Sequence, residues 1–317
     1  MSDTIERCRR FYEEKGAPMI HQKFPEYESR IAVGVCGEGS DCFGYDDGIS
    51  QDHDFGIGFA MWLTDEDYQV IGPALQNAYR ELIGPAAASR LDFRRGVTTI
   101  REYYKRILGV DMNPLRPGMT ASQWFTIDES KLACAVNGQV FRDDLGLFTR
   151  VRTELNYYYP DRIWRMRLVN GLHDFSQYGQ ANYGRCMGRG DAVAAELCRS
   201  KGIEAAMALA FLVNKVYAPY YKWTYRALRD LPGCEKLADI LEKLALTPSQ
   251  QGAWTNYTYD STRTNPSDEI ERLFEAAARE LMEMLYSAGL IAEKVTFLEY
   301  HCGYVSAHMD QPIIPRN

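Results

Sequence analysis

The feature that most constrains this chain is a change in sequence texture near residue 150. Before that point, short apolar runs typical of buried strands alternate with helical segments, whereas after it only helical periodicity remains. Strands require a sheet that buries its faces against helices, and amphipathic helices alone require a bundle. The sequence therefore predicts an α+β chain in which residues 1–150 form a domain with a sheet and residues 151–317 form an all-α helical domain.

The elements of the first domain follow from apolar runs and the residues that interrupt them. We expect strands at 31–36, 55–63 and 96–100, a further strand or hairpin at 131–141, and helices at 4–15, 64–82 and 101–108. Thr64 can cap the start of its helix, and Gly109 stops the last one. Asn137-Gly138 is typical of a hairpin turn.

The second domain is predicted as a series of helices at 160–186, 190–216, 219–230, 234–245 and 267–287. In the last segment apolar residues recur at helical spacing, Ser267 can cap the start, and Gly289 marks the end. Pro219 should kink or break the chain where it occurs, because it cannot donate a helical hydrogen bond.

Composition narrows the classes of function. The 317 residues carry a formal net charge of −7, which argues against a nucleic-acid partner. The N-terminal residues lack the apolar core of a signal peptide, and no apolar run approaches the roughly 18 residues of a membrane span. The eight cysteines form no Cys-x-x-Cys pair, so we expect reduced, mostly buried thiols in a cytoplasmic protein.

One stretch has the residues of a phosphate and metal site. Gly39-Ser40 follows the first predicted strand, and after eleven further residues Asp52-His53-Asp54 opens the second. A turn at Gly39-Ser40 lets backbone N–H groups and the serine hydroxyl approach phosphate. Side chains at i and i+2 share one face of a strand, so Asp52 and Asp54 can bind magnesium together, while His53 points away and packs.

This motif resembles the signature of the polymerase-β nucleotidyltransferase superfamily, whose small-molecule members pair such a domain with a helical C-terminal domain. The string Gly-Glu-Gly-Ser-x-x-x-Gly-x-Asp-Asp-x-x-Ser-x-Asp-His-Asp-x-Gly is similar to one bacterial branch, a nucleotidyltransferase-like family whose C-terminal part is a domain of unknown function. Blocks that resemble the same family are Trp124, Gly138 to Asp143, Tyr158 to Pro160, Arg185, and Asn214 to Trp223. The resemblance implies a polymerase-β-like fold, a mixed sheet with helices, in the first domain.

The resemblance also implies roles for the motif residues. Gly39 and Ser40 would contact the triphosphate of ATP, and Asp52 and Asp54 would bind Mg²⁺ as metal ligands and catalytic residues. The helical domain would close the cleft and select the acceptor.

The superfamily commonly adds a third carboxylate from a later strand, which binds metal or acts as a base towards the acceptor hydroxyl. Here the sequence departs from the pattern, because the strand expected at 96–100 contains no acid. The candidates are Glu102 just beyond that strand and Asp143 after the Val140-Phe141 strand, which rank equally, and Asp92 just before the strand.

The segment 214–223 leaves two interpretations open. It places two lysines among four aromatic residues. Lys215 or Lys222 could reach the triphosphate from a wall of the cleft, or both could simply cover packed aromatic rings with their aliphatic stems.

Other charged residues are more simply explained by local structure. Asp46-Asp47 could anchor metal, although a turn in a solvated loop is favoured. Glu38 and Asp41 are expected to face solvent or to fix the loop, because they would repel phosphate. Arg185 could contact phosphate, but a place in a solvated loop is favoured.

The leading hypothesis is a Mg²⁺-dependent nucleotidyltransferase that moves AMP from ATP onto a hydroxyl of a small-molecule acceptor. The missing third acid motivates an alternative, a catalytically degenerate nucleotide-binding sensor or partner module. A further alternative is an adenylyltransferase that modifies a Tyr, Ser or Thr of a protein. No membrane partner is expected, and the oligomeric state is left open.

Overall fold

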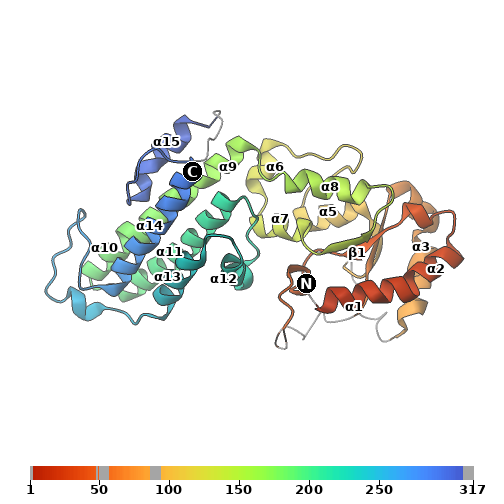
Figure 1. Ribbon diagram of the computed structural model, residues 1–317, viewed down its shortest axis with the longest axis horizontal. Helices are drawn as coiled ribbons and strands as arrows, with labels where there is room; N and C mark the ends of the chain where they lie inside the picture. The colour runs from red at the N-terminus through yellow and green to blue at the C-terminus, as the bar shows by residue number, and fades with distance from the viewer. Residues whose placement is uncertain (1–2, 48, 50–56, 86–93, 310–317) are drawn as a thin grey trace. The chain divides into compact units, whose positions relative to one another are not determined.

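A computed structural model describes residues 3–47, 49, 57–85 and 94–309. The chain divides into two compact units, Met1–Tyr158 and Tyr159–Asn317, where the sequence predicted a division at 150/151. Strands occur in the first unit, and the described residues of the second unit form helices and their connections (Figure 1). The α+β class predicted from the change in texture is confirmed at this level.

The first unit is built on a four-stranded mixed sheet with the strand order β3-β2-β1-β4. Its strands are β1 (Ala32–Val35), β2 (Ala60–Leu63), β3 (Gly96–Thr99) and β4 (Gln139–Arg142). β1 is antiparallel to both β2 and β4, and β2 is parallel to β3. The end of β1 and the starts of the other three strands therefore lie together. We call this the β1-exit end of the sheet, and the opposite end the β1-entry end.

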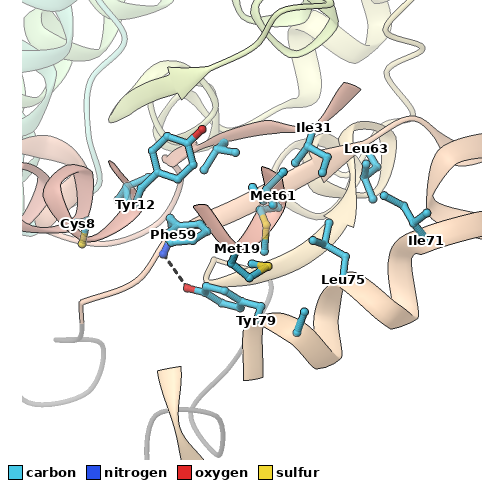
Figure 2. Close-up of a cluster of buried hydrophobic side chains, with 14 of the residues drawn as sticks. Cys8, Tyr12, Met19, Ile31, Phe59, Met61, Leu63, Ile71, Leu75 and Tyr79 are labelled. Atoms are coloured by element: carbon cyan, nitrogen blue, oxygen red, sulfur yellow. Dashed lines mark hydrogen bonds between the residues drawn. The ribbon is translucent and has the colours of Figure 1, made fainter. Parts of the chain in front are cut away.

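The N-terminal helices and α3 cover one face of the sheet. The elements on this face are α1 (Asp3–Phe11), the π-helix η1 (Tyr12–Gly16), α2 (Ala17–Lys23) and α3 (Asp65–Ile83). Figure 2 shows Met19, Met61 and Leu75 in the buried cluster that joins them to the strands. The backbone N–H of Phe59 donates to the Tyr79 hydroxyl at 2.8 Å, which fixes the chain just before β2 to α3.

The other face of the sheet is aromatic. Trp62 stacks on Phe148 of α8 (Leu147–Asn156) with ring centroids 3.9 Å apart. Tyr103 of α5 (Ile100–Leu108) packs edge-on against the same indole. Successive residues of a strand point to opposite faces, so Met61 packs against the N-terminal helices and α3, and Trp62 packs against α5 and α8. All four residues of β1 and of β2 are buried, as expected for strands covered on both faces.

The local signals for helix ends in the first unit are confirmed. Thr64 Oγ1 accepts a hydrogen bond from Asp67 N at 3.1 Å at the start of α3. Gly109 adopts a left-handed conformation directly after α5. The predicted strand or hairpin at 131–141 is wrong in its first half, where α7 (Glu129–Val136) forms because Asp128 caps the N–H of Ser130. Within the predicted segment, only the residues of β4 form a strand.

The second unit contains helices in all five predicted segments and a further α-helix near its end. α9 (Asp161–Phe175), the π-helix η4 (Ser176–Asn182) and α10 (Tyr183–Gly188) run on from one another, followed by α11 (Ala192–Asn214), α12 (Tyr221–Arg229), α13 (Glu235–Leu246), α14 (Glu269–Ser287) and α15 (Cys302–Ala307). Pro219 lies in the break between α11 and α12, as predicted. The cap of α14 is Asp268, whose Oδ1 accepts from the N–H groups of the first turn, and not Ser267.

All eight cysteines are free, and five of them are buried. Within the part of the chain that the structure describes, no helix combines the length and the apolar character needed to cross a bilayer.

Candidate functional site

The predicted phosphate contacts lie in a glycine-rich turn at the β1-exit end of the sheet. We call residues 37–44 the β1 loop. Gly39 has a φ of +133°, a conformation that side chains with a Cβ rarely adopt. A Cβ on Gly39 would also lie 2.5 Å from Asp41 Oδ1. Ser40 follows and immediately precedes the short helix η3 (Asp41–Phe43). The turn expected at Gly39-Ser40 is present, and it requires glycine.

Two side chains from later in the chain brace the β1 loop. Gly37 N donates to Asn137 Oδ1 at 2.9 Å, and Asn137 Nδ2 donates back to Gly37 O at 2.8 Å. Arg152 of α8 donates to the carbonyls of Asn137 and Gly138 and contacts Cys36 Sγ at 3.4 Å. Burial, opposed by Arg152, raises the pKa of the Cys36 thiol to about 11. Arg152 therefore supports the loop through its neighbours, the carbonyls of Asn137 and Gly138 and the thiol of Cys36.

The first half of the β1 loop presents backbone donors. Within the described chain, the amides of residues 38–41 make no hydrogen bond. The amides that follow are occupied, because Cys42 N donates to Asp41 Oδ1, and Gly44 N and Tyr45 N donate to loop carbonyls. Successive N–H groups in a glycine turn are the donors that anions use in proteins. The loop therefore has the chemistry of an anion site.

Two arginines that the sequence analysis did not single out lie against the β1 loop. Arg94 Nη1 donates to Glu38 O at 3.2 Å and would lie 3.6 Å from a Cβ on Gly39. Arg95 Nη2 donates to Asp41 Oδ2 at 2.7 Å, with the two side chains only 15% and 13% exposed. The sequence signal for these arginines was the Arg-Arg-Gly run directly before the third predicted strand. Because β3 starts at the β1-exit end, residues just before it lie near the β1 loop.

The carboxylates near the loop have local roles. Asp41 is held by Arg95 and by Cys42 N, and Glu38 is exposed, so both agree with the expectation that they fix the loop or face solvent. Asp46 Oδ2 accepts from Thr4 N at 3.2 Å. Asp47 Oδ1 accepts from Ile49 N at 3.1 Å, which is the turn contact favoured from sequence.

The predicted metal ligands Asp52 and Asp54 lie outside the described residues, as do His53 and Asp92. The described chain resumes at Ile57 and reaches β2 at the β1-exit end of the sheet. Among the residues that the structure does describe, no group of three or more His, Cys, Asp or Glu is arranged to hold a metal ion.

The structure does not bring Glu102 and Asp143 to the β1 loop. β3 starts at the β1-exit end and runs away from it, and Glu102 follows in the exposed first turn of α5, where its N–H donates to Thr99 Oγ1. β4 also runs away from the loop, and Asp143 Oδ2 accepts from Thr149 N at 2.7 Å. A strand of this length spans roughly 10 Å, so both acids lie at the β1-entry end.

Lys215 and Lys222 belong to the second unit and lie over aromatic rings. Lys215 follows α11 with a φ of +52°, and its Nζ is 4.1 Å from the Trp164 ring centroid. Lys222 Nζ is 5.1 Å from the Trp223 ring centroid. Both lysines are exposed, and these contacts agree with the packing interpretation. Their contact with a triphosphate stays a prediction.

The part of the chain from α6 (Ala121–Thr126) to α12 is similar to a known family. Residues 124–224 match the model of a domain of unknown function, DUF4037. The matched segment contains Asn137 and Arg152, which brace the β1 loop, and ends before the second half of the helical unit. No curated protein and no solved structure matches the chain.

Proposed function

We propose that this protein is a Mg²⁺-dependent nucleotidyltransferase that moves AMP from ATP onto a hydroxyl of a small-molecule acceptor. The observation that carries the proposal is the β1 loop, whose amides at 38–41 have no hydrogen-bond partner in the described chain and beside which Arg94 lies. A triphosphate is a polyanion that accepts from N–H groups and guanidinium together.

Each part of the site would have a distinct task. The β1 loop would bind the triphosphate, with Gly39 allowing close approach and Ser40 adding a hydroxyl donor. Mg²⁺ would be held by Asp52 and Asp54, as the motif predicts, while Asp41 is paired with Arg95. When bound, Mg²⁺ neutralises the charge that develops on the phosphate oxygens. The Asn137 and Arg152 contacts keep the donors fixed before the ligand arrives.

The transfer itself exchanges a phosphoanhydride bond of ATP for a phosphodiester bond to the acceptor. The acceptor oxygen forms a bond to the α-phosphorus, the bond from that phosphorus to the bridging oxygen breaks, and pyrophosphate leaves. The proton of the acceptor hydroxyl passes to a base.

A nucleotide-binding protein without transfer activity is the second candidate. The positions of Glu102 and Asp143 at the β1-entry end favour it, because neither acid lies where an acceptor next to the β1 loop would need a base. Binding of ATP is common to both candidates, and only product formation separates them.

The first experiment measures ATP binding by calorimetry with and without Mg²⁺. We expect saturable, Mg²⁺-dependent binding that weakens about tenfold or more in the double variant Asp52→Asn, Asp54→Asn, equivalent to ~1.4 kcal/mol or more. The matched control is Asp174→Asn, which changes an exposed aspartate of α9. Unchanged binding in the double variant would sink the metal assignment.

The second experiment follows the label from ATP labelled at the α-phosphate, in an extract of small molecules and proteins. A labelled small molecule supports the proposed transfer. Label on macromolecules would indicate protein modification, and tight binding without any labelled product would favour the second candidate.

A further inference from the structure

The helical unit contains a cavity of about 950 Å³ that the β1 loop plays no part in forming. Sites for small molecules have volumes of roughly 300 to 1,000 Å³. The cavity is lined by η4, α10, α14 and the segment 257–266, together with Thr296 and Phe297. The lining residues that carry the following argument are Gln180, Arg185, Arg263, Glu271 and Glu275.

Glu271 is the buried acid of this cavity. It is only 7% exposed, and its Oε2 accepts from Asn265 N. Its Oε1 has no hydrogen-bond partner among the described residues. A Cβ at position 184 would collide with that oxygen, so α10 packs closely here because Gly184 lacks one. Because Oε1 has no donor in the described part of the chain, a ligand in the cavity that donates to it would supply a hydrogen bond that this part does not make.

The charges beside Glu271 have the same sign. Glu275 lies one turn further along α14 and also lines the cavity, and Asp268 caps the same helix. Burial, opposed by the hydrogen bond from Asn265 N and assisted by the charges of Asp268 and Glu275, raises the pKa of Glu271 to about 7. A positive charge placed here would stabilise both glutamates.

The arginines of the cavity do not supply that charge. Arg263 lies 3.8 Å from Asp260, and Arg185 donates to Asn182 Oδ1 at 3.0 Å. In the described chain neither forms an ion pair with Glu271 or Glu275. Arg185 lies on α10 rather than in the solvated loop that the sequence favoured.

The π-helix η4 fixes the second acid. Gln180 Nε2 donates to Glu275 Oε1 at 3.0 Å and to Thr296 O at 2.9 Å, and its Oε1 accepts from Leu298 N at 3.1 Å. Glu275 is thus held in the cavity wall by a side chain that is itself anchored to Thr296 O and Leu298 N. π-Helical turns occur frequently at functional sites. The two carboxylates are therefore positioned before any ligand binds.

We propose that this cavity is a second ligand site, which binds a small hydroxylated amine through its ammonium group, held by the carboxylates of Glu271 and Glu275. The hydroxyl groups of the ligand are matched by those of the lining segment, which includes Thr258, Ser261, Thr262 and Thr264. The site is independent of the triphosphate chemistry, and its test uses no nucleotide.

A matched pair of probes tests the role of the ammonium group. 2-Amino-1,3-propanediol and its N-acetyl derivative share their hydroxyl groups, but only the first carries a positive charge. We expect the 317-residue chain to bind the amine at millimolar concentration and the amide at least about tenfold more weakly. Equal binding of both probes, or no saturable binding of the amine, would overturn the proposal.

Two variants locate the binding. Glu271→Gln keeps the acceptor for Asn265 N, and Glu275→Gln keeps the contact with Gln180, so each variant should fold. Each should lower the affinity for the amine about tenfold. Glu280→Gln, on the same helix but outside the cavity lining, is the control and should bind as the parent does. Undiminished binding in both cavity variants would place the amine elsewhere and refute the site.

Proton release distinguishes binding at Glu271 from non-specific association of the amine, which would not change the protonation of this residue. The charges that act on Glu271 are those of Asp268, the cap of α14, and of Glu275 on α14. The other charged residues of the cavity lining are Arg185 on α10 and Asp260 and Arg263 in the segment 257–266, and η4 contributes none. A cation beside Glu271 lowers its pKa, so binding at pH 7 should release protons. Calorimetry in two buffers of different ionisation enthalpy measures this release, which Glu271→Gln should abolish. Proton uptake would contradict the proposal.

Discussion

The β1 loop and the cavity of the helical unit are opposite in charge and in construction. The loop offers backbone N–H groups beside a guanidinium, and its shape depends on Gly39 and on braces from Asn137 and Arg152. The cavity offers two carboxylates on one continuous helix. Substitutions other than to proline leave the backbone donors in place, so most substitutions disable the loop by moving it. The cavity can be disabled by changing one side chain.

The largest effect should come from Gly39→Ala, which moves the loop. The new Cβ meets Asp41 Oδ1, and the φ of +133° disfavours alanine, so we expect a loss of ~1–3 kcal/mol in stability. ATP binding should fall about 100-fold or more, as the donors are displaced. Calorimetry measures the binding, with Gly118→Ala as the control because a Cβ there has no neighbour within 4 Å. Normal ATP affinity in Gly39→Ala would show that ATP binding does not depend on the conformation of the β1 loop.

Asn137→Ala tests the brace without touching the loop itself. It removes both hydrogen bonds to Gly37, whose backbone groups are buried, and should cost about 2 kcal/mol locally. Hydrogen exchange at the Gly37 amide should accelerate accordingly, while the exposed control Asn256→Ala leaves it unchanged. If exchange at Gly37 is unaffected, the loop is held by other contacts and the brace is unimportant.

The smallest effect concerns Glu271 and depends on pH. Its pKa in the folded protein, about 7, lies above the ordinary 4.5, so the folded state holds the extra proton between these values. The stability of the parent protein should therefore fall as pH rises from about 4.5 to about 7, and remain lower above that. Glu271→Gln does not titrate, and should exceed the parent in stability by ~1–2 kcal/mol at pH 8.

Thermal unfolding of both proteins at pH 5 and pH 8 measures this difference. We expect a smaller gain, or none, at pH 5, where the parent carboxyl is protonated. A difference between the two proteins that does not change with pH would show that Glu271 is not the neutral acid of the cavity.

Local patterns were readable from the sequence, and pairing between distant segments was not. Thr64, Gly109 and the apolar run of β1 act through near neighbours, and each was identified correctly. The strand or hairpin expected at 131–141 failed because the cap at Asp128 favours a helix over the apolar residues that follow. Ser267 was preferred to its neighbour Asp268 as a cap, and sequence alone offers little to separate them.

The candidate site shows the same division. The turn at Gly39-Ser40 was identified from its composition, but which end of the sheet receives Glu102 and Asp143 depends on strand direction, which arises from pairing. Glu271 sits beside an apolar helical stripe and looks like an ordinary polar neighbour. Its burial depends on Gly184, which is far away in sequence, so no local pattern could have revealed it.

The paired hydrogen bonds between Gly37 and Asn137 also bear on inheritance. They tie a residue before the DUF4037 match to one inside it, and the match itself runs across the boundary between the two units. A recombination event that carried residues 124–224 alone would transfer β4 and Arg152 without the strand they serve. A gene that lost this segment would keep the loop without its supports. We therefore expect the segment that carries β1 and its loop to be inherited together with residues 124–224. The matched segment alone does not form a complete structural domain.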